Sequence, residues 1–322
     1  NYHRNDKRLP PLPAQVQRRY RTKNLSSTML NSEKESIAQS IDRLNIQHTY
    51  KDSDITIGRQ AITFGKAFFF NPLDIFRPFG PATIDTSYKS GVDGIRIDTA
   101  TDDFSGIDVM GVLGQENTQS KRSWDASSLL ARYYNNIQDF DIALQGGKIF
   151  AGYHLGFGIT GEKNDIELRA ELFQFFKKNK KNLSKNHTSF VLGIGYYFKN
   201  DVHWQLEYFR NGLGETHDFY KSYQRLQQGL TQNLSRDLLA TSITKDLNPI
   251  VKARLALLYG INDHSYKVQP DITFSLSDNL ELLTALSLNF GKKPTLNGPV
   301  VHPKSEFGTN SHIIYLQLKY YF

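Results

Sequence analysis

Hydrophobic and polar residues alternate with a period of two along most of this chain, most clearly from His312 to Phe322. One face of that segment carries Ile314, Leu316, Leu318, Tyr320 and Phe322, and the other carries Ile313, Tyr315, Gln317, Lys319 and Tyr321. A period of two is typical of a β-strand, whereas a helix repeats every 3.6 residues. The pattern therefore predicts a strand with one strongly apolar face.

The same alternation predicts strands throughout the chain. They lie at about 41–50, 55–65, 91–100, 105–113, 127–137, 139–149, 151–161, 165–176, 187–199, 202–211, 235–246, 249–260, 266–277, 279–291 and 312–322, with a weaker candidate at 18–30. Most are longer than the roughly 5–6 residues of a typical soluble strand. They approach the roughly 9–11 residues that a tilted strand needs to cross a bilayer.

One predicted strand contains a change of face. Ile55 and Ile57 share one parity, whereas Ile62 and Phe64 share the other. One extra residue near Gly58 and Arg59 would reconcile them, so we expect a β-bulge there that leaves Arg59 facing the interior.

The connections between the predicted strands alternate in length. Short ones fall at 161–164, 199–201, 246–248 and 277–279, and long ones at 66–90, 114–126, 177–186, 212–234 and 292–311. Counted back from the last strand, every long connection falls at the same end. Transmembrane barrels have this asymmetry between tight turns and long outer loops. We therefore predict an all-β fold, an antiparallel transmembrane β-barrel of about 16 strands. A soluble β-sandwich is the alternative.

Composition agrees with this fold and narrows the location. The mean hydropathy is −0.48, and no stretch approaches the roughly 20 apolar residues of a membrane helix. Barrel strands expose only every second residue to lipid, so low hydropathy does not argue against them. The 17 Tyr and 21 Phe suit strands and membrane-interface belts, and the chain has no Cys. We expect a processed mature chain, with residues 1–17 as a Pro-rich periplasmic lead-in and 18–322 as the barrel.

The longest aromatic connection is expected to matter for function. Residues 66–90 (KAFFFNPLDIFRPFGPATIDTSYKS) contain five Phe and three Pro. So many aromatic side chains would be sticky if they were exposed. We predict that this segment folds into the mouth or lumen of the barrel, and a self-packed outer cap is the alternative.

The alternation, the loop asymmetry and the terminal aromatic residue together resemble the Gram-negative outer-membrane porins. The stretches Asp42-Arg43-Leu44, Ile57 to Ile62, Asn71 to Phe76 and Pro78-Phe79 resemble a family of uncharacterised porin-like barrels over roughly residues 42–97. The resemblance implies a barrel fold and a bacterial outer-membrane location, and it implies no substrate and no catalytic residue.

The functional surface of a channel is its interior. By parity, the predicted pore-lining residues are Arg43, Arg59, Arg96, Arg132, Arg169, Glu167, Glu171, Lys252, Arg254, Lys267, Asp271 and Lys319. Opposed charges in a pore order passing solutes, and an excess of one sign selects ions. The excess here is basic, which predicts weak anion preference; the alternative is that these charges pair and stiffen the wall. Arg59 and Arg96 flank the aromatic connection and are the first constriction candidates.

The net charge of +7 has other consequences for partners. The basic residues are dispersed, which argues against nucleic acid, except for one run on an outer connection. Lys177, Lys178, Lys180 and Lys181 in that run are predicted to contact lipopolysaccharide phosphates, and a solvated loop is the alternative. We expect no cofactor and no metal site, because the His residues lack metal-ligand spacing.

Three functions follow in order of preference. The first is a porin for diffusion of small polar or anionic solutes, with a homo-oligomer left open. The second is a barrel that sheathes or anchors a periplasmic or extracellular partner, such as an electron-transfer cytochrome or an export component. The third is a lipid hydrolase, because His187-Thr188-Ser189 is similar to the nucleophile and base spacing of outer-membrane phospholipases. That spacing is weak and lacks a third orienting residue.

Overall fold

Antiparallel strands dominate the computed structural model, which describes residues 19–23, 25–31, 36–76, 78–80, 83, 88–115, 122–178, 183–297 and 300–321. Fifteen strands form one antiparallel sheet in the order β3 to β16 followed by β19. Every strand from β3 to β16 pairs with its neighbours in sequence, and β19 pairs with β16 because the small hairpin β17–β18 lies between them in the chain.

The predicted strands agree with the observed ones to within a few residues. The strands of the large sheet are β3 Leu44–Tyr50, β4 Ser53–Gln60, β5 Val92–Asp102, β6 Ser105–Val112, β7 Ser128–Ile137, β8 Phe140–Ile149, β9 Gly152–Lys163, β10 Ile166–Lys177, β11 His187–Phe198, β12 Val202–Arg210, β13 Asp237–Asn248, β14 Val251–Gly260, β15 Tyr266–Ser277, β16 Leu280–Phe290 and β19 Ile313–Tyr320. The hairpin β17 Thr295–Asn297 and β18 Val300–His302 and the short helix α2 Tyr220–Gln227 complete the long connections.

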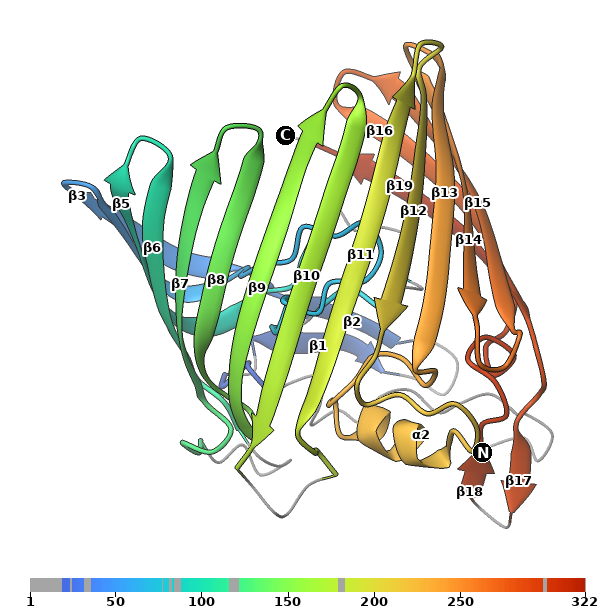
Figure 1. The fold of residues 1–322 in the computed structure, drawn as a ribbon, viewed down its shortest axis with the longest axis horizontal. Helices are drawn as coiled ribbons and strands as arrows, with labels where there is room; N and C mark the ends of the chain where they lie inside the picture. Colours follow the sequence, from blue (N-terminus) through green and yellow to red (C-terminus); the bar gives the residue numbers. More distant parts are fainter. Residues whose placement is uncertain are drawn as a thin grey trace.

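The large sheet curls around an interior, with the short hairpin turns at one end and the long connections at the other (Figure 1). The fold is an antiparallel β-barrel, as the alternation predicts. We call these ends the hairpin end and the loop end. The last strand runs toward the hairpin end, so the loop end is the outer side under the barrel prediction.

The two faces of the sheet differ in the way that a bilayer requires. Large apolar side chains stay exposed on the outward positions of most strands, among them Ile46, Ile95, Leu144, Leu155, Leu168, Leu192, Leu255, Ile314, Leu316 and Leu318. The intervening inward positions carry polar and charged side chains, many of them buried, such as Asp108, Glu171 and Glu207. An exposed apolar belt of this size is unstable in water and stable against lipid.

The bulge predicted at Gly58 and Arg59 is wrong. Register runs without a shift through this point on both sides of β4, with Gly58 opposite Asn45 and Gly94, and Arg59 opposite Leu44 and Asp93. The strand ends at Gln60, so Ile62 and Phe64 belong to the following connection and their parity places no constraint on β4. Gly58 instead has φ of +125°, a conformation that favours glycine.

The N-terminal candidate strand at 18–30 does not join the large sheet. Ser26–Asn31 forms β1, which pairs with β2 Ser36–Ser40 in a separate two-stranded sheet. The sequence of this segment has little apolar alternation. The lead-in 1–17 and the terminal Phe322 lie outside the described residues. Among the residues that the structure does describe, no helix has the length and apolar composition needed to cross a membrane.

Candidate functional site

The connection after β4 crosses the interior of the barrel. Its described part, residues 61–76 and 78–80, is called the lumen loop below. Figure 1 shows this blue segment behind β9, β10 and β11, inside the curve of the sheet. Its hydrogen bonds go to inward side chains of β8, β10 and β12, so the loop is fixed to the inner wall at three alternate strands.

Glu207 on β12 holds the Phe-rich part of the lumen loop. Its carboxylate accepts the backbone N–H groups of Phe68 at 2.6 Å, Phe69 at 3.1 Å and Phe70 at 2.7 Å. The side chain is fully buried, with an exposed fraction of 0%. Successive backbone N–H groups form a concave site for an anion, and hydrogen bonds to an ionised acceptor are stronger than neutral ones. The carboxylate therefore fixes the loop conformation.

Glu171 on β10 holds both ends of the same turn. Its Oε1 accepts the backbone N–H of Lys66 at 2.7 Å and of Ala67 at 3.2 Å, and its Oε2 accepts that of Leu73 at 3.2 Å. On β8, Gln145 donates from Nε2 to the carbonyl oxygen of Leu73 at 3.1 Å. The sequence predicts Glu171 as a pore-lining acid, and in the structure its carboxylate binds the loop backbone.

Glycines on the wall make room for two side chains of the lumen loop. A Cβ placed on Gly193 would lie 3.3 Å from the Phe68 ring, and one on Gly195 would lie 3.2 Å from it. A Cβ on Gly156 would lie 2.5 Å from Leu73 Cδ2. Small residues in a strand allow this close approach, so Phe68 and Leu73 sit in shallow slots beside the two carboxylates.

Aromatic packing completes the attachment of the loop. Phe70 stacks on Phe209 of β12 with ring centroids 4.9 Å apart, and Phe76 meets Tyr20 edge to face at 5.2 Å. Phe76 is fully buried. The aromatic side chains that would be sticky in water therefore form part of two buried clusters inside the barrel.

A buried ion pair ties the later part of the connection to the lumen loop. The Lys89 ammonium donates to the Asp74 carboxylate, and both side chains are about 95% buried, with exposed fractions of 6% and 5%. Burial raises the pKa of Asp74 and lowers the pKa of Lys89, and the attraction between the two groups opposes both shifts. Removal of either partner would leave a buried charge without compensation.

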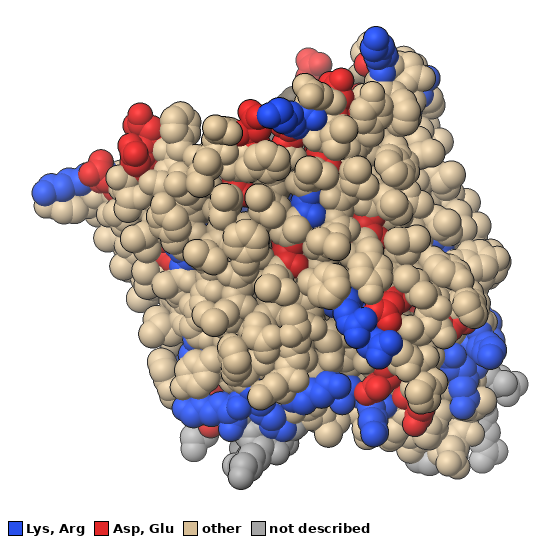
Figure 2. Space-filling view, viewed as in Figure 1, with Lys and Arg blue, Asp and Glu red and all other residues tan. Residues whose placement is uncertain are grey.

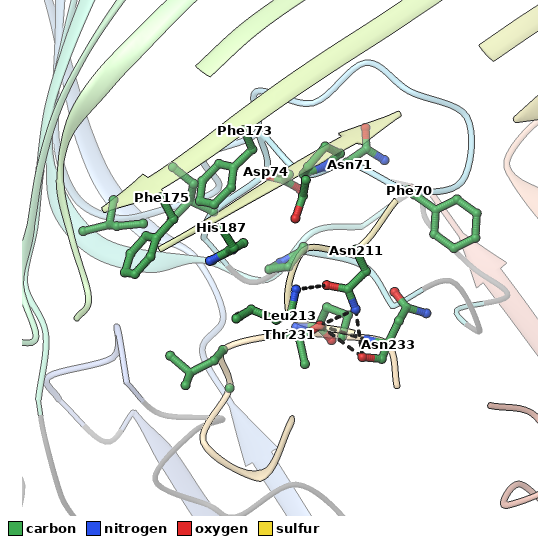
Figure 3. A pocket seen from close by; sticks show the side chains of 18 of the residues that line it. Phe70, Asn71, Asp74, Phe173, Phe175, His187, Asn211, Leu213, Thr231 and Asn233 are labelled. Carbon is green, nitrogen blue, oxygen red and sulfur yellow. Dashed lines mark hydrogen bonds between the residues drawn. The ribbon is translucent and has the colours of Figure 1, made fainter. Parts of the chain in front are cut away.

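The lumen loop separates two cavities. The larger, of about 230 Å³, opens at the loop end and is walled by Phe69, Phe70, Phe79, Phe173, Phe175 and Phe209 together with polar side chains. Figure 3 shows Asp74 and Asn71 above Asn211, which donates from Nδ2 to Thr231 Oγ1 and to the Asn233 carbonyl, each at 3.0 Å. The smaller cavity, of about 180 Å³, lies toward the hairpin end.

The hairpin-side cavity is lined by charge of both signs. Lys66, Arg132 and Arg169 face Asp141 and Glu171 across it. Lys66 pairs with Asp141 at 2.5 Å, and Arg169 pairs with Glu167 at 3.3 Å while its guanidinium lies 4.1 Å from the Phe68 ring centre. Arg132 lies 5.7 Å from the Phe64 ring centre, and within the described residues its Nε has no hydrogen-bond partner.

Most of the other predicted pore-lining charges are paired along the wall. Arg96 pairs with Asp108 at 2.7 Å and with Asp98 at 3.0 Å. Arg254 pairs with Asp271 at 2.8 Å, and Lys252 with Asp246 at 3.5 Å. Lys267 is 1% exposed, and Lys319 takes an inward position on β19, half-buried. Several inward charges of the wall are thus paired with opposite charges.

Arg43 and Arg59 lie at the loop-end rim. Arg43 donates to the Lys89 carbonyl at 2.7 Å and packs on Tyr88. Arg59 is 4% exposed, pairs with Asp93 at 2.6 Å and donates to the Lys23 carbonyl at 2.6 Å. It therefore fixes the N-terminal segment to the rim, a role that strand parity alone does not reveal.

The His187 and Ser189 side chains both line the loop-end cavity. The structure gives each a different partner: His187 Nδ1 lies 2.8 Å from the Lys185 carbonyl, and Ser189 Oγ accepts the Gly212 N–H at 3.0 Å. This is not the base-to-nucleophile hydrogen bond that a hydrolase uses. Across the described ranges, no group of three His, Asp or Glu side chains is close enough to share a metal ion.

Comparison with known proteins supports the fold. No family model and no curated protein matches the chain. Among solved structures, OccK5 (OpdH) of Pseudomonas aeruginosa is 9% identical with a TM-score of 0.56, over 80% of this chain and 79% of that one. OccK11 (OpdR) of the same organism is 11% identical with a TM-score of 0.54, over 80% and 77%. The outer membrane protein OpdK, also from P. aeruginosa, is 10% identical with a TM-score of 0.52, over 77% and 74%.

The chain therefore has the fold of the Gram-negative outer-membrane porins. Its outward apolar belt and its asymmetric ends agree with a bacterial outer-membrane location. Sequence reasoning predicted the barrel fold correctly. It missed Glu207 as the residue that holds the lumen loop, although Gly193 and Gly195 on the next strand marked the place where another segment approaches the wall.

Proposed function

We propose that this barrel is a passive channel for small polar or anionic solutes, narrowed by the lumen loop. The observation that carries the proposal is the loop itself, which is docked between two cavities by two buried wall carboxylates. A segment fixed in this way narrows the lumen without a separate plug domain, and diffusion through the remaining space needs no cofactor.

The route runs between the lumen loop and the wall formed by β14, β15, β16 and β19. Inward side chains that face the loop are buried, as Glu207 and Glu171 show with exposed fractions of 0% and 5%. On β14, by contrast, the Arg254 and Lys252 side chains keep exposed fractions of 31% and 59%. These two side chains stay wet toward the hairpin end of β14 and support a water-filled space there, whereas inward side chains nearer the loop end of the same wall, such as Lys267 and Asn289, are buried with exposed fractions of 1% and 3%.

The charges on this route support a weak preference for anions. Arg254 is more exposed than its partner Asp271, whose side chain is 9% exposed, and Lys252 and Lys319 lie on the same wall. Passing solutes therefore meet the Arg254 guanidinium before the Asp271 carboxylate, which attracts negative groups. The partial pairing keeps the preference small.

The test is single-channel conductance of the purified full chain in a planar bilayer with a salt gradient across it. Steady conductance with a reversal potential on the anion side supports the proposal. A folded barrel that conducts nothing would contradict it and would favour the sheath for a partner protein, because a lumen closed by its own loop has no transport role.

A further inference from the structure

Basic side chains gather on the outward surface at the loop end of the barrel. Figure 2 shows many Lys and Arg along this edge of the viewed face, with some Asp and Glu among them, below a wide band that carries few charged atoms. A cation at the boundary of the apolar belt sits at the level of lipid headgroups. Whether such a cation can bind a lipid phosphate depends on how neighbouring side chains orient it.

Two arginines on this surface share one carboxylate. Arg210, the last residue of β12, and Asp237, the first of β13, are opposite each other in the sheet. Asp237 Oδ1 accepts from Arg210 Nη1 at 3.3 Å and from the Tyr208 hydroxyl at 2.8 Å. Its Oδ2 accepts from Arg236 Nε at 3.0 Å and from Asn262 Nδ2 at 3.2 Å. Four donors thus converge on one carboxylate.

The cluster faces outward. Glu207 points into the lumen, so its neighbour Tyr208 and the alternate residue Arg210 point away from it. The Tyr208 ring packs on Phe190 with centroids 5.9 Å apart, and Leu192, the next outward residue of β11, is 54% exposed. The two guanidinium groups therefore lie directly beyond an aromatic pair at the edge of the lipid-facing surface.

The cluster keeps positive charge and free donor capacity. The Arg210 and Arg236 side chains are 42% and 41% exposed, whereas Asp237 between them is 10% exposed. Two guanidinium groups opposite one carboxylate leave an excess of one positive charge. Each guanidinium has five N–H donors, and the Asp237 contacts use one from each. The carboxylate orients both forks and leaves most of their donors facing out.

We propose that Arg210 and Arg236 bind a phosphate group of outer-leaflet lipid A, the phosphorylated anchor of lipopolysaccharide. Planar guanidinium groups match phosphate oxygens in a bidentate way that lysine does not. The acyl chains would lie along Phe190, Leu192 and the apolar surface below. Lys178, whose Nζ lies 3.3 Å from the Tyr153 hydroxyl, is a further cation on this rim. The proposal does not depend on whether the lumen conducts.

The test measures binding of lipid A to the purified full chain in detergent by native mass spectrometry. Diphosphoryl lipid A is the probe, and the same lipid A with its phosphates removed is the comparison. We expect R210Q/R236Q to raise the dissociation constant for the diphosphoryl form about tenfold, because two charge-assisted contacts are lost. Binding of the dephosphorylated form should already be weak and should not change.

Two further variants keep the outcome clear. R210K/R236K keeps both charges beside Asp237 and so protects the fold if the glutamine variant does not assemble; it should raise the dissociation constant about threefold, since it loses the planar fork. K163Q removes an exposed cation at the hairpin end and should bind as the parent does. Equal binding of both lipid A forms, or unchanged binding by both arginine variants, would overturn the proposal.

Discussion

The Glu207 Oε2 atom lies 2.6 Å from the backbone nitrogen of Phe68, although the two residues are 139 positions apart in the chain. The contact joins the inner wall of the barrel to the segment that narrows it. It also explains why Glu207 is buried without a basic partner, whereas other inward acids such as Asp108 and Asp271 pair with arginines. The behaviour of the channel should therefore depend on a few contacts between the lumen loop and the wall.

Removal of the Glu207 carboxylate should release the lumen loop. E207A leaves three N–H groups without their acceptor, and each buried unsatisfied donor costs about 1–3 kcal/mol. We expect higher single-channel conductance with more open-channel noise. Asp278 is an exposed acid in the hairpin turn between β15 and β16, so D278A is the matched control. Conductance and noise in E207A that equal those of D278A would contradict the role given to Glu207.

The Gly193 slot should be coupled to Phe68. G193V puts a side chain where the Phe68 ring lies, since even a Cβ would be 3.3 Å from it, and should displace the loop. F68A removes the ring and should make the valine tolerable, so the double variant F68A/G193V should be more stable than the sum of the single effects predicts. We expect a coupling of about 0.5–3 kcal/mol from thermal unfolding of the purified barrel. If the effects of F68A and G193V on stability simply add, the Phe68 ring does not lie against Gly193.

Ion selectivity should respond to the Arg254 and Asp271 pair with opposite signs. R254Q leaves the Asp271 carboxylate unpaired beside the proposed route, so the reversal potential should move toward cation preference. D271N leaves the guanidinium unpaired and should move it toward anions. K163Q, on the outside of the barrel, should leave it unchanged. A shift of the same sign in both wall variants would mean that the route lies elsewhere.

The contact of Glu306 with Leu234 and Ser235 at the loop end should loosen as pH rises. Glu306, in the connection before β19, accepts the backbone N–H groups of Leu234 and Ser235. Burial raises the pKa of Glu306 from 4.5 to about 7. Between pH 4.5 and about 7, the Glu306 side chain keeps its proton while it is in contact with Leu234 and Ser235, and it loses that proton when the contact opens. Rising pH therefore lowers the stability of the closed contact.

Hydrogen exchange at Leu234 and Ser235 checks this dependence. Protection, corrected for the intrinsic exchange rate, should fall on the order of tenfold or more from pH 5 to pH 8. E306Q should remove the dependence, and D201N, in a hairpin turn, should keep it. Protection that stays level or rises with pH in the parent protein would contradict the assignment.

The sequence predicted the wall better than the contents of the barrel. Period-two alternation is a local signal, so strands such as Tyr266–Ser277 were placed to the residue, and inward positions such as Glu171 followed from parity. The ion pair of Arg96 with Asp108 depends only on the register between the neighbouring strands β5 and β6. These features depend on residues close together in the sheet.

Contacts made by irregular backbone segments cannot be predicted from strand alternation. The docking of Phe68 on Glu207 joins a connection to a strand far along the chain, and no repeat links them. The sequence predicts an inward Arg59 only through a bulge that the structure does not contain, and the partners of Arg59 include the Lys23 carbonyl in a segment with no alternation. The parity change near Gly58 predicts a bulge only if Ile62 and Phe64 belong to the strand, and β4 ends before them at Gln60.

The central claim is that the lumen beside the docked loop is open to small solutes. Single-channel recording of the purified full chain in a planar bilayer, with a tenfold salt gradient, tests it most directly. We expect discrete, steady conductance steps and a reversal potential on the anion side. A correctly folded barrel that inserts and shows no steps would contradict the claim, because the loop would then close the lumen completely.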